Sequence, residues 1–252
     1  MNTAIVIGNG ESRLIYPIKE LKGKATIYGC NAIYRDHPTL CDYIVSVNET
    51  MYQEVKQAKE KMDYTFEIIG PENLSKWDYI VPGDHEYTSP KGQEFYRFWT
   101  GTKGEFNSIK KRDFSKNRGS GTSAVLHAAE QGFGNILIIG FDILGAKQWE
   151  KKNNEVSHEQ NNVYKNTRNY PDRDSMKGYL KYEWLYHLTQ IFRYFPLINF
   201  YFFSRKEYIY KNPFICTYFN FAPKNLKVGS YADFHRYVND EKENIVWTKL
   251  NF

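Results

Sequence analysis

The chain has 252 residues, of which 41% are hydrophobic and 17% aromatic, and its formal net charge is +5. A chain of this length can bury a hydrophobic core, and the mildly basic balance suits an anionic ligand without indicating nucleic-acid binding. The three cysteines, Cys30, Cys41 and Cys216, are too scattered to predict a disulfide framework or a zinc site. The sequence predicts no transmembrane helix and no signal peptide, so we expect a cytoplasmic protein.

The first predicted element is a buried strand over Ala4-Ile5-Val6-Ile7, which stops at Gly8-Asn9-Gly10. Open α/β sheets bind ligands just beyond the carboxyl ends of their strands. Glycine has no Cβ, so the backbone at Gly8 and Gly10 can approach a phosphate or a ribose closely. We therefore expect the turn after this strand to bind a nucleotide.

Two further strands are predicted over residues 25–28 and 42–47, and they end at Asn31 and Asn48. In a parallel sheet, Asn9, Asn31 and Asn48 would gather along one edge. An asparagine amide offers a donor and an acceptor, which suits a base, a ribose hydroxyl or a phosphate oxygen. Asparagine also favours turns, which is the simpler interpretation of each residue alone. For the three together we favour ligand contact.

The middle of the chain is less regular. The pattern predicts a short helix over 15–21, a solvated helix over 49–62 and strands over 66–69 and 78–81. Residues 103–118 contain six basic and two acidic side chains, among aromatic-rich surroundings. Such a stretch can bind phosphates or single-stranded nucleic acid, although a solvated loop over one edge of the sheet is the simpler interpretation.

A glycine- and hydroxyl-rich turn, Arg118-Gly-Ser-Gly-Thr-Ser123, opens the next predicted helix. Free N–H groups at a helix start favour an anion, so Ser120, Gly121 and Thr122 are candidate donor-binding residues. The most apolar strand follows over 135–139 and leads to Asp142. Asp142 sits where a ribose or catalytic contact is expected, or it caps a turn.

The remainder contains a polar stretch over 143–174, which we interpret as a lid because long loops in compact domains are usually functional or disordered. An amphipathic helix is predicted over 175–194 and a last buried strand over 198–203, and residues 205–252 form a C-terminal extension. The fold class is therefore α/β: a single Rossmann-like domain over 1–252, with a mostly parallel sheet and a long lid loop.

Two nucleotide-binding classes are disfavoured. The chain lacks GxxxxGK[ST], so it is not a P-loop NTPase. GNGES is not GxGxxG, and the second strand has no acidic residue at its end to hold a ribose, so a dehydrogenase is disfavoured.

As a set, GNGES after the first strand, GCN after the second, VN after the third, and RGSG with GFGNILIIGFD resemble the bacterial lipooligosaccharide sialyltransferases. That family has GNGPS, RCN, a strand ending in Asn, and R-x-T-S-G before SGID. The resemblance covers residues 3–50 and 118–142. It implies a CMP-activated sugar donor, metal-independent direct displacement, and nucleotide contacts from Asn9, Asn31, Asn48, Ser120 and Gly121.

The chain departs from that family at two places. The family's two phosphate-binding tyrosines are replaced around Leu144 and Trp149, so we expect Tyr164, Tyr170, Arg168 or Lys147 of the lid to contact the donor. The family's general-base histidine lies just before the helix that begins here at 175, and this chain has no histidine in residues 170–174. We predict Asp172 as the general base, with Asp174 and His158 as competitors; Asp174 also suits the N-cap of that helix.

These patterns predict a glycosyltransferase that moves a sugar from a nucleotide donor to an acceptor hydroxyl, with the nucleotide sugar as substrate and no separate cofactor. Asp172-Arg-Asp174 spells the DxD of metal-dependent glycosyltransferases and leaves a divalent ion open. Two alternatives remain. One is a bacteriophage-type enzyme that glycosylates hydroxymethylated pyrimidines in DNA, and the other is a non-catalytic nucleotide-binding accessory protein. The acceptor is accordingly a glycan or DNA.

Overall fold

The computed structural model describes residues 2–70, 119–142, 162–170, 187–188, 191–205 and 223–247. Within these residues the strands form one seven-stranded sheet in the order β4-β3-β2-β1-β5-β6-β7, and every neighbouring pair is parallel. The strands are β1 (Thr3–Ile7), β2 (Thr26–Cys30), β3 (Tyr43–Val45), β4 (Glu67–Ile69), β5 (Asn135–Ile139), β6 (Asn199–Ser204) and β7 (Leu226–Ser230). The predicted α/β class with a parallel sheet is confirmed.

Apolar side chains cover both faces of the sheet, as expected for parallel strands that are buried on both sides. On one face, Val6 and Ile138 pack with helix α4 (Ser120–Glu130) through residues such as Val125. On the other face, Ile5 and Ile139 belong to a second cluster. The continuous apolar runs of β1 and β5 follow from this two-sided burial.

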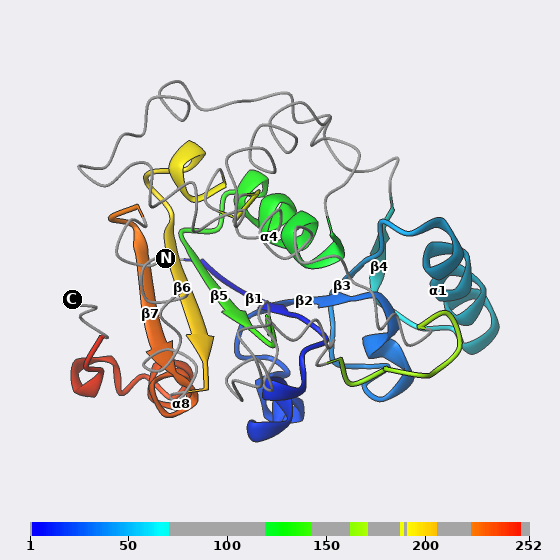
Figure 1. Cartoon of the computed structure of the whole chain (residues 1–252), viewed down its shortest axis with the longest axis horizontal. Coiled ribbons are helices and arrows are strands. Elements are labelled where there is room, and N and C mark those ends of the chain that lie inside the picture. The colour runs from blue at the N-terminus through cyan, green and yellow to red at the C-terminus, as the bar shows by residue number, and fades with distance from the viewer. Residues whose placement is uncertain are drawn as a thin grey trace, which may run out of the picture.

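The helices form layers against these two faces (Figure 1). Helix α4 crosses the face above β1, β2 and β3, whereas α1 (Glu49–Met62) lies beside β4 and α8 (Tyr231–Val238) lies near β7. Met51 of α1 and Phe234 of α8 are buried in the second cluster, so both helices cover the face opposite α4. No helix in the described part of the chain is long and apolar enough to cross a membrane.

Several elements differ from the sequence predictions. The short helix expected over 15–21 is two 3-10 helices, η1 (Glu11–Ile15) and η2 (Ile18–Leu21). The C-terminal extension contributes strand β7 as well as helices. Val228 and Gly229 of β7 are buried beside β6, whereas Lys227 is exposed and its Nζ lies over the rings of Tyr201 and Trp247. The predicted strand over 78–81 and most of the predicted helix over 175–194 lie outside the described residues.

Candidate functional site

The strand order places a topological switch point between β1 and β5. The chain proceeds from β1 through β2 and β3 to β4 on one side, and then returns to the other side of β1 as β5. Open α/β sheets bind ligands in the crevice outside the carboxyl ends at such a point. The turn Gly8-Asn9-Gly10 follows β1 there, and Asp142 follows β5.

The two glycines of this turn are packed tightly against the end of β5. A Cβ at Gly8 would lie 2.4 Å from the carbonyl oxygen of Gly140, and a Cβ at Gly10 would lie 2.5 Å from Cγ of Asp142. The backbone N–H of Gly10 also donates to the Gly140 oxygen at 2.8 Å. Contact between the two strand ends therefore accounts for both glycines, and their predicted approach to a ligand stays a prediction.

Asn9 is the centre of a buried hydrogen-bond network. Its Nδ2 donates to the backbone oxygen of Cys30 at 3.0 Å and to the hydroxyl of Tyr170 at 3.1 Å. Its Oδ1 accepts from the guanidinium of Arg13 at 2.8 Å. Arg13 is only 1% exposed, and it also donates to the Gly8 oxygen at 3.2 Å and to the Tyr164 hydroxyl at 2.8 Å.

A second short chain of hydrogen bonds joins the ends of β2 and β3 to the start of α4. The backbone N–H of Val47 donates to Oγ of Ser120 at 3.2 Å, and that hydroxyl donates to Oδ1 of Asn31 at 2.8 Å. Asn31 has a φ of 49°, in the left-handed region that asparagine tolerates better than most residues. The N-terminus of α4, with its free N–H groups, therefore lies at the same sheet edge as Asn31.

The other residues of this helix start are held by packing. Ser120 and Thr122 are buried, and a Cβ at Gly121 would lie 2.8 Å from the ring of Phe141. Asn48 is the N-cap of α1, where its Oδ1 accepts from the Met51 N–H at 3.2 Å. The structure thus gives Asn48 the capping role that is common for asparagine, while its ligand contact remains a prediction.

Asp142 meets the η1 turn at the end of β5. Its Oδ2 accepts from the backbone N–H of Ser12 at 2.8 Å, and its Oδ1 is buried without a hydrogen-bond partner among the residues that the structure describes. Burial raises the pKa of this carboxyl, against the lowering effect of the Ser12 hydrogen bonds and of the Arg205 charge. The Ser12 hydroxyl lies 2.9 Å from the Tyr231 hydroxyl. The Tyr231 hydroxyl also accepts a hydrogen bond from the Gly140 N–H at 3.0 Å.

Residues 162–170 of the predicted lid lie against the turn after β1. The N–H of Val163 donates to the Asn9 oxygen at 2.9 Å, and Asn162 forms an isolated bridge with Gly10. Of the predicted donor contacts in this segment, Tyr164 is buried, Tyr170 is half-buried and the Arg168 side chain is exposed. The structure brings the Tyr170 hydroxyl to Asn9 and the Tyr164 hydroxyl to Arg13.

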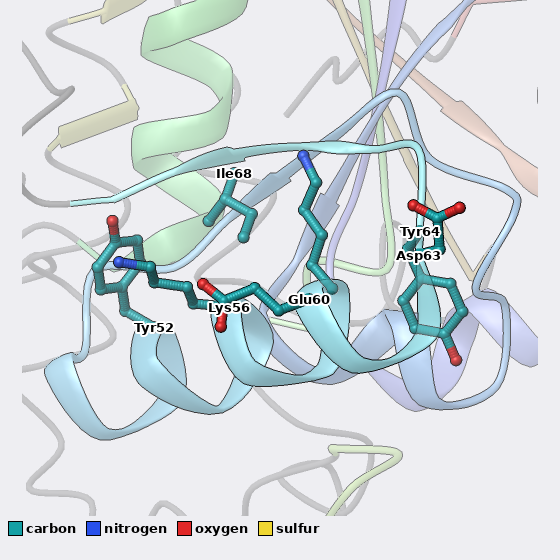
Figure 2. Close-up of a pocket in the computed structure, with 7 residues that line it drawn as sticks. Tyr52, Lys56, Glu60, Asp63, Tyr64 and Ile68 are labelled. Carbon is teal, nitrogen blue, oxygen red and sulfur yellow. The ribbon is translucent and has the colours of Figure 1, made fainter.

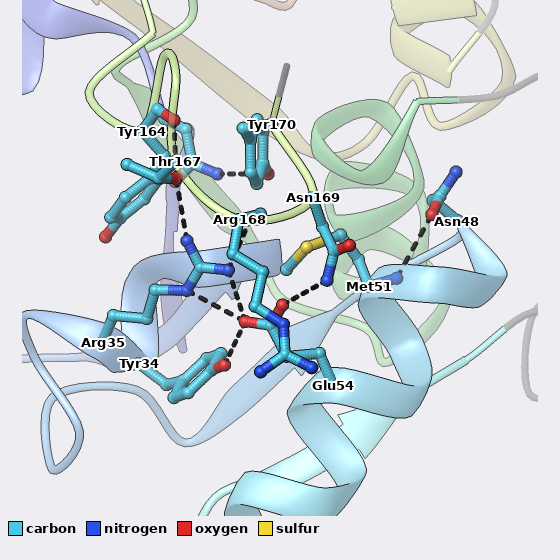
Figure 3. A network of polar contacts seen from close by, with 11 residues as sticks. Tyr34, Arg35, Asn48, Met51, Glu54, Tyr164, Thr167, Arg168, Asn169 and Tyr170 are labelled. Atoms are coloured by element: carbon cyan, nitrogen blue, oxygen red, sulfur yellow. Dashed lines mark hydrogen bonds and ion pairs between the residues drawn. The ribbon is translucent and has the colours of Figure 1, made fainter.

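A polar network fastens the segment to α1 and to η3 (Asn31–Arg35) (Figure 3). Arg35 donates to Oγ1 of Thr167 at 2.9 Å and to the backbone oxygen of Arg168 at 2.8 Å. The carboxylate of Glu54 accepts from Arg35 and from the amide of Asn169. Although burial acts to raise the pKa of Glu54, hydrogen bonds from Tyr34, Arg35 and Asn169 outweigh it and lower the pKa.

The three candidate catalytic residues, Asp172, Asp174 and His158, lie outside the described residues, as does the basic stretch over 103–118. Within the described ranges, no group of three or more His, Cys, Asp or Glu side chains is arranged to hold a metal ion. The general base and the metal dependence stay predictions.

Arg13 and Tyr231 contribute hydrogen bonds to the site, but neither can be recognised from the sequence. Arg13 falls in a short polar segment that resembles a solvated turn, so nothing local marks it as buried. Tyr231 is 219 residues from its partner Ser12, and only the assembled sheet brings the two together. The local sequence signal for the start of α8 is a capping box, in which Ser230 is the N-cap and Asp233 follows three residues later.

A separate pocket of about 360 Å³ lies between α1 and β4 (Figure 2). Its walls include Tyr52, Lys56 and Ile68. None of the residues predicted from the sequence to bind the donor lines this pocket. It is therefore distinct from the arrangement at the carboxyl ends of β1, β2 and β5.

No family model matches the sequence, and a search of curated proteins finds no significant match. Matching solved structures include the sialyltransferase CstII from Campylobacter jejuni in complex with the substrate analogue CMP-3FNeuAc. The identity is 16%, the match covers 80% of this chain and 81% of that chain, and the TM-score is 0.44. CstII in complex with cytidine-5'-monophosphate matches at 16% identity over 80% of this chain and 79% of that chain, with a TM-score of 0.40. The likeness is one of fold and is distant.

Proposed function

We propose that the chain is a glycosyltransferase that binds a nucleotide-activated sugar at the carboxyl ends of β1, β2 and β5 and transfers the sugar to an acceptor hydroxyl. One observation carries the proposal. Polar side chains from separate segments meet at the switch point of the sheet, where Asn9, Asn31, Ser120 and Asp142 are all held by internal hydrogen bonds. This is the place where open α/β sheets bind nucleotides.

The donor nucleotide is proposed to be CMP-linked, on the strength of the sequence motifs at these same residues. In the proposed reaction, the acceptor oxygen attacks the anomeric carbon while the bond from that carbon to the phosphate oxygen breaks. The bonding electrons leave with the phosphate. Amide N–H groups and the N-terminus of α4 can stabilise that developing charge because they are already oriented and cost no reorganisation.

The acceptor hydroxyl must lose its proton to a base, and Asp172 is the proposed one. Asp142 is the alternative among the described residues. A carboxyl whose pKa is raised by burial is a better base near neutral pH than an exposed one. The Asp172→Asn and Asp142→Asn variants distinguish the two, because loss of the true base should reduce turnover by about 100-fold or more.

The test is incubation with a panel of CMP-, UDP- and GDP-sugars, with and without hydroxymethylated DNA, followed by mass spectrometry of the released nucleotide. Release of CMP from a CMP-sugar is the expected result. Release only in the presence of DNA would identify DNA as the acceptor. Absence of release from every donor, together with absence of nucleotide binding by calorimetry, would contradict the proposed function.

A further inference from the structure

This inference rests on the proposed function and concerns residues 162–170, which pair with the turn after β1 through the bridge between Asn162 and Gly10. Figure 3 shows how Thr167 and Asn169 of this segment contact Arg35 and Glu54. The first residues of the segment pair with the backbone of the Gly8-Asn9-Gly10 turn, and its last residue, Tyr170, accepts a hydrogen bond from the Asn9 side chain. Both ends of the segment therefore contact the turn at which the donor is proposed to bind.

The amide of Asn9 has a fixed direction. Arg13 has only donors, so the atom of Asn9 that faces it at 2.8 Å must be the oxygen. The Asn9 NH2 group is left to face the Cys30 oxygen and the Tyr170 hydroxyl. Arg13 thus acts as a positioning residue that presents Asn9 as a donor.

The amide of Asn31 is directed in the same way by Ser120. The Val47 N–H supplies a proton to the Ser120 oxygen, and the Ser120 hydroxyl in turn donates to Oδ1 of Asn31. The Asn31 NH2 group therefore faces away from Ser120. Hydrogen bonds from the side chains of Asn9 and Asn31 both act to lower the pKa of Tyr170, although its burial raises that pKa overall. The Asn9 amide therefore donates to the phenolic oxygen of Tyr170 at 3.1 Å, and the Asn31 side chain lies beside the same oxygen.

We propose that the Tyr170 hydroxyl occupies the position of a ligand oxygen between Asn9 and Asn31, so that donor binding requires this tyrosine to withdraw. The ligand group that fits is a phosphate oxygen of the nucleotide. A negatively charged oxygen accepts stronger hydrogen bonds than a neutral phenol does, and the buried Arg13 charge beside Asn9 adds to that preference. The segment is an internal competitor of the donor.

The remaining contacts of the segment allow such a release. Thr167, Arg168 and Asn169 are exposed, and they are attached to Arg35 and Glu54 by side-chain and carbonyl hydrogen bonds at the surface. Segments held by exposed hydrogen bonds and few buried apolar contacts open at low free-energy cost. Within residues 162–170 only Tyr164 is fully buried, and the Tyr170 ring is half-buried against the second cluster and the Tyr164 ring. Opening of the Tyr170 end therefore exposes one half-buried ring while Tyr164 stays in place.

The test is calorimetric titration of the full chain with CMP, comparing the wild type with Tyr170→Phe, Asn169→Ala and the control Tyr64→Phe. Tyr170→Phe keeps the ring but leaves the Asn9 amide without this acceptor, which destabilises the occluded arrangement. We expect CMP to bind this variant about threefold to tenfold more tightly, from the usual net worth of one hydrogen bond. Asn169→Ala removes the hydrogen bond from the segment to Glu54, at a position that contacts neither Asn9 nor Asn31. This variant should therefore also bind CMP more tightly than wild type.

Tyr64→Phe removes the same phenolic oxygen from a tyrosine outside the site and should leave CMP affinity unchanged. Equal or weaker CMP binding by Tyr170→Phe and by Asn169→Ala, with a wild type that binds CMP, would overturn the competitor role and leave the proposed function standing. Absence of CMP binding by the wild type and by every variant, with the same outcome for UMP and GMP, would overturn both.

Discussion

Replacement of Arg13 by methionine should destabilise the protein strongly. Arg13 is 1% exposed and donates three hydrogen bonds, to Gly8, Asn9 and Tyr164. Methionine fills most of the volume but leaves all three acceptors without their donor. A buried acceptor that loses its partner costs about 1–3 kcal/mol. Removal of the guanidinium also removes the cost of burying its charge, and this gain offsets part of the loss from the three acceptors. We therefore expect the free energy of unfolding to fall by about 3 kcal/mol.

The assay is urea unfolding followed by tryptophan fluorescence, with Arg168→Met as the matched control. The Arg168 side chain is exposed, so its replacement should change the free energy of unfolding by less than about 0.5 kcal/mol. For a chain of this size, 3 kcal/mol corresponds to a melting temperature lower by about 6–12 °C. A loss below about 1 kcal/mol for Arg13→Met would refute the view that this guanidinium holds the turn after β1.

Three other variants probe the same region. Gly10→Ala should lower the free energy of unfolding by about 3 kcal/mol in urea, because its φ of −65° accepts alanine while the added Cβ would lie 2.5 Å from Asp142. Ser120→Ala should cost about 1–2 kcal/mol in the same assay, since Val47 and Asn31 lose their shared partner. The pKa of Asp142 is raised in the folded state, so its ionisation disfavours folding as the pH rises through that pKa. The stability of Asp142→Asn relative to wild type should therefore increase between pH 4 and pH 8. An unchanged difference over that range, or losses below about 0.5 kcal/mol for the other two variants, would contradict these assignments.

The sequence predicts the central sheet well because its strands are continuous apolar runs buried on both faces. Residues 4–7 and 135–139 have this pattern, and each ends in glycine and a polar side chain, so both the strands and their carboxyl ends can be located. The asparagines at 9 and 31 are accordingly found at one edge. The contact of both asparagines with Tyr170 depends on a segment that is more than 130 residues away along the chain.

What the sequence does not show is the order of the strands and the partners of buried polar groups. The switch point depends on β5 returning to pair with β1, which no local pattern encodes. Strand β7 was missed because its burial is incomplete, with Lys227 exposed at the edge of the described sheet. Arg13 was missed because an arginine in a short turn is normally solvated, and its burial depends on Tyr164 and Asn9 together.

The most direct test of the proposed site is CMP affinity measured by calorimetry for the wild type, Asn31→Asp and Lys56→Gln. Asn31→Asp keeps the size of the side chain and its acceptor for Ser120, but it replaces the NH2 donor by a carboxylate oxygen that repels a phosphate. Lys56→Gln alters the separate pocket between α1 and β4. We expect Asn31→Asp to weaken CMP binding at least tenfold, while the CMP affinity of Lys56→Gln stays within about twofold of wild type. Loss of CMP binding in Lys56→Gln, with Asn31→Asp unchanged, would contradict the proposed site.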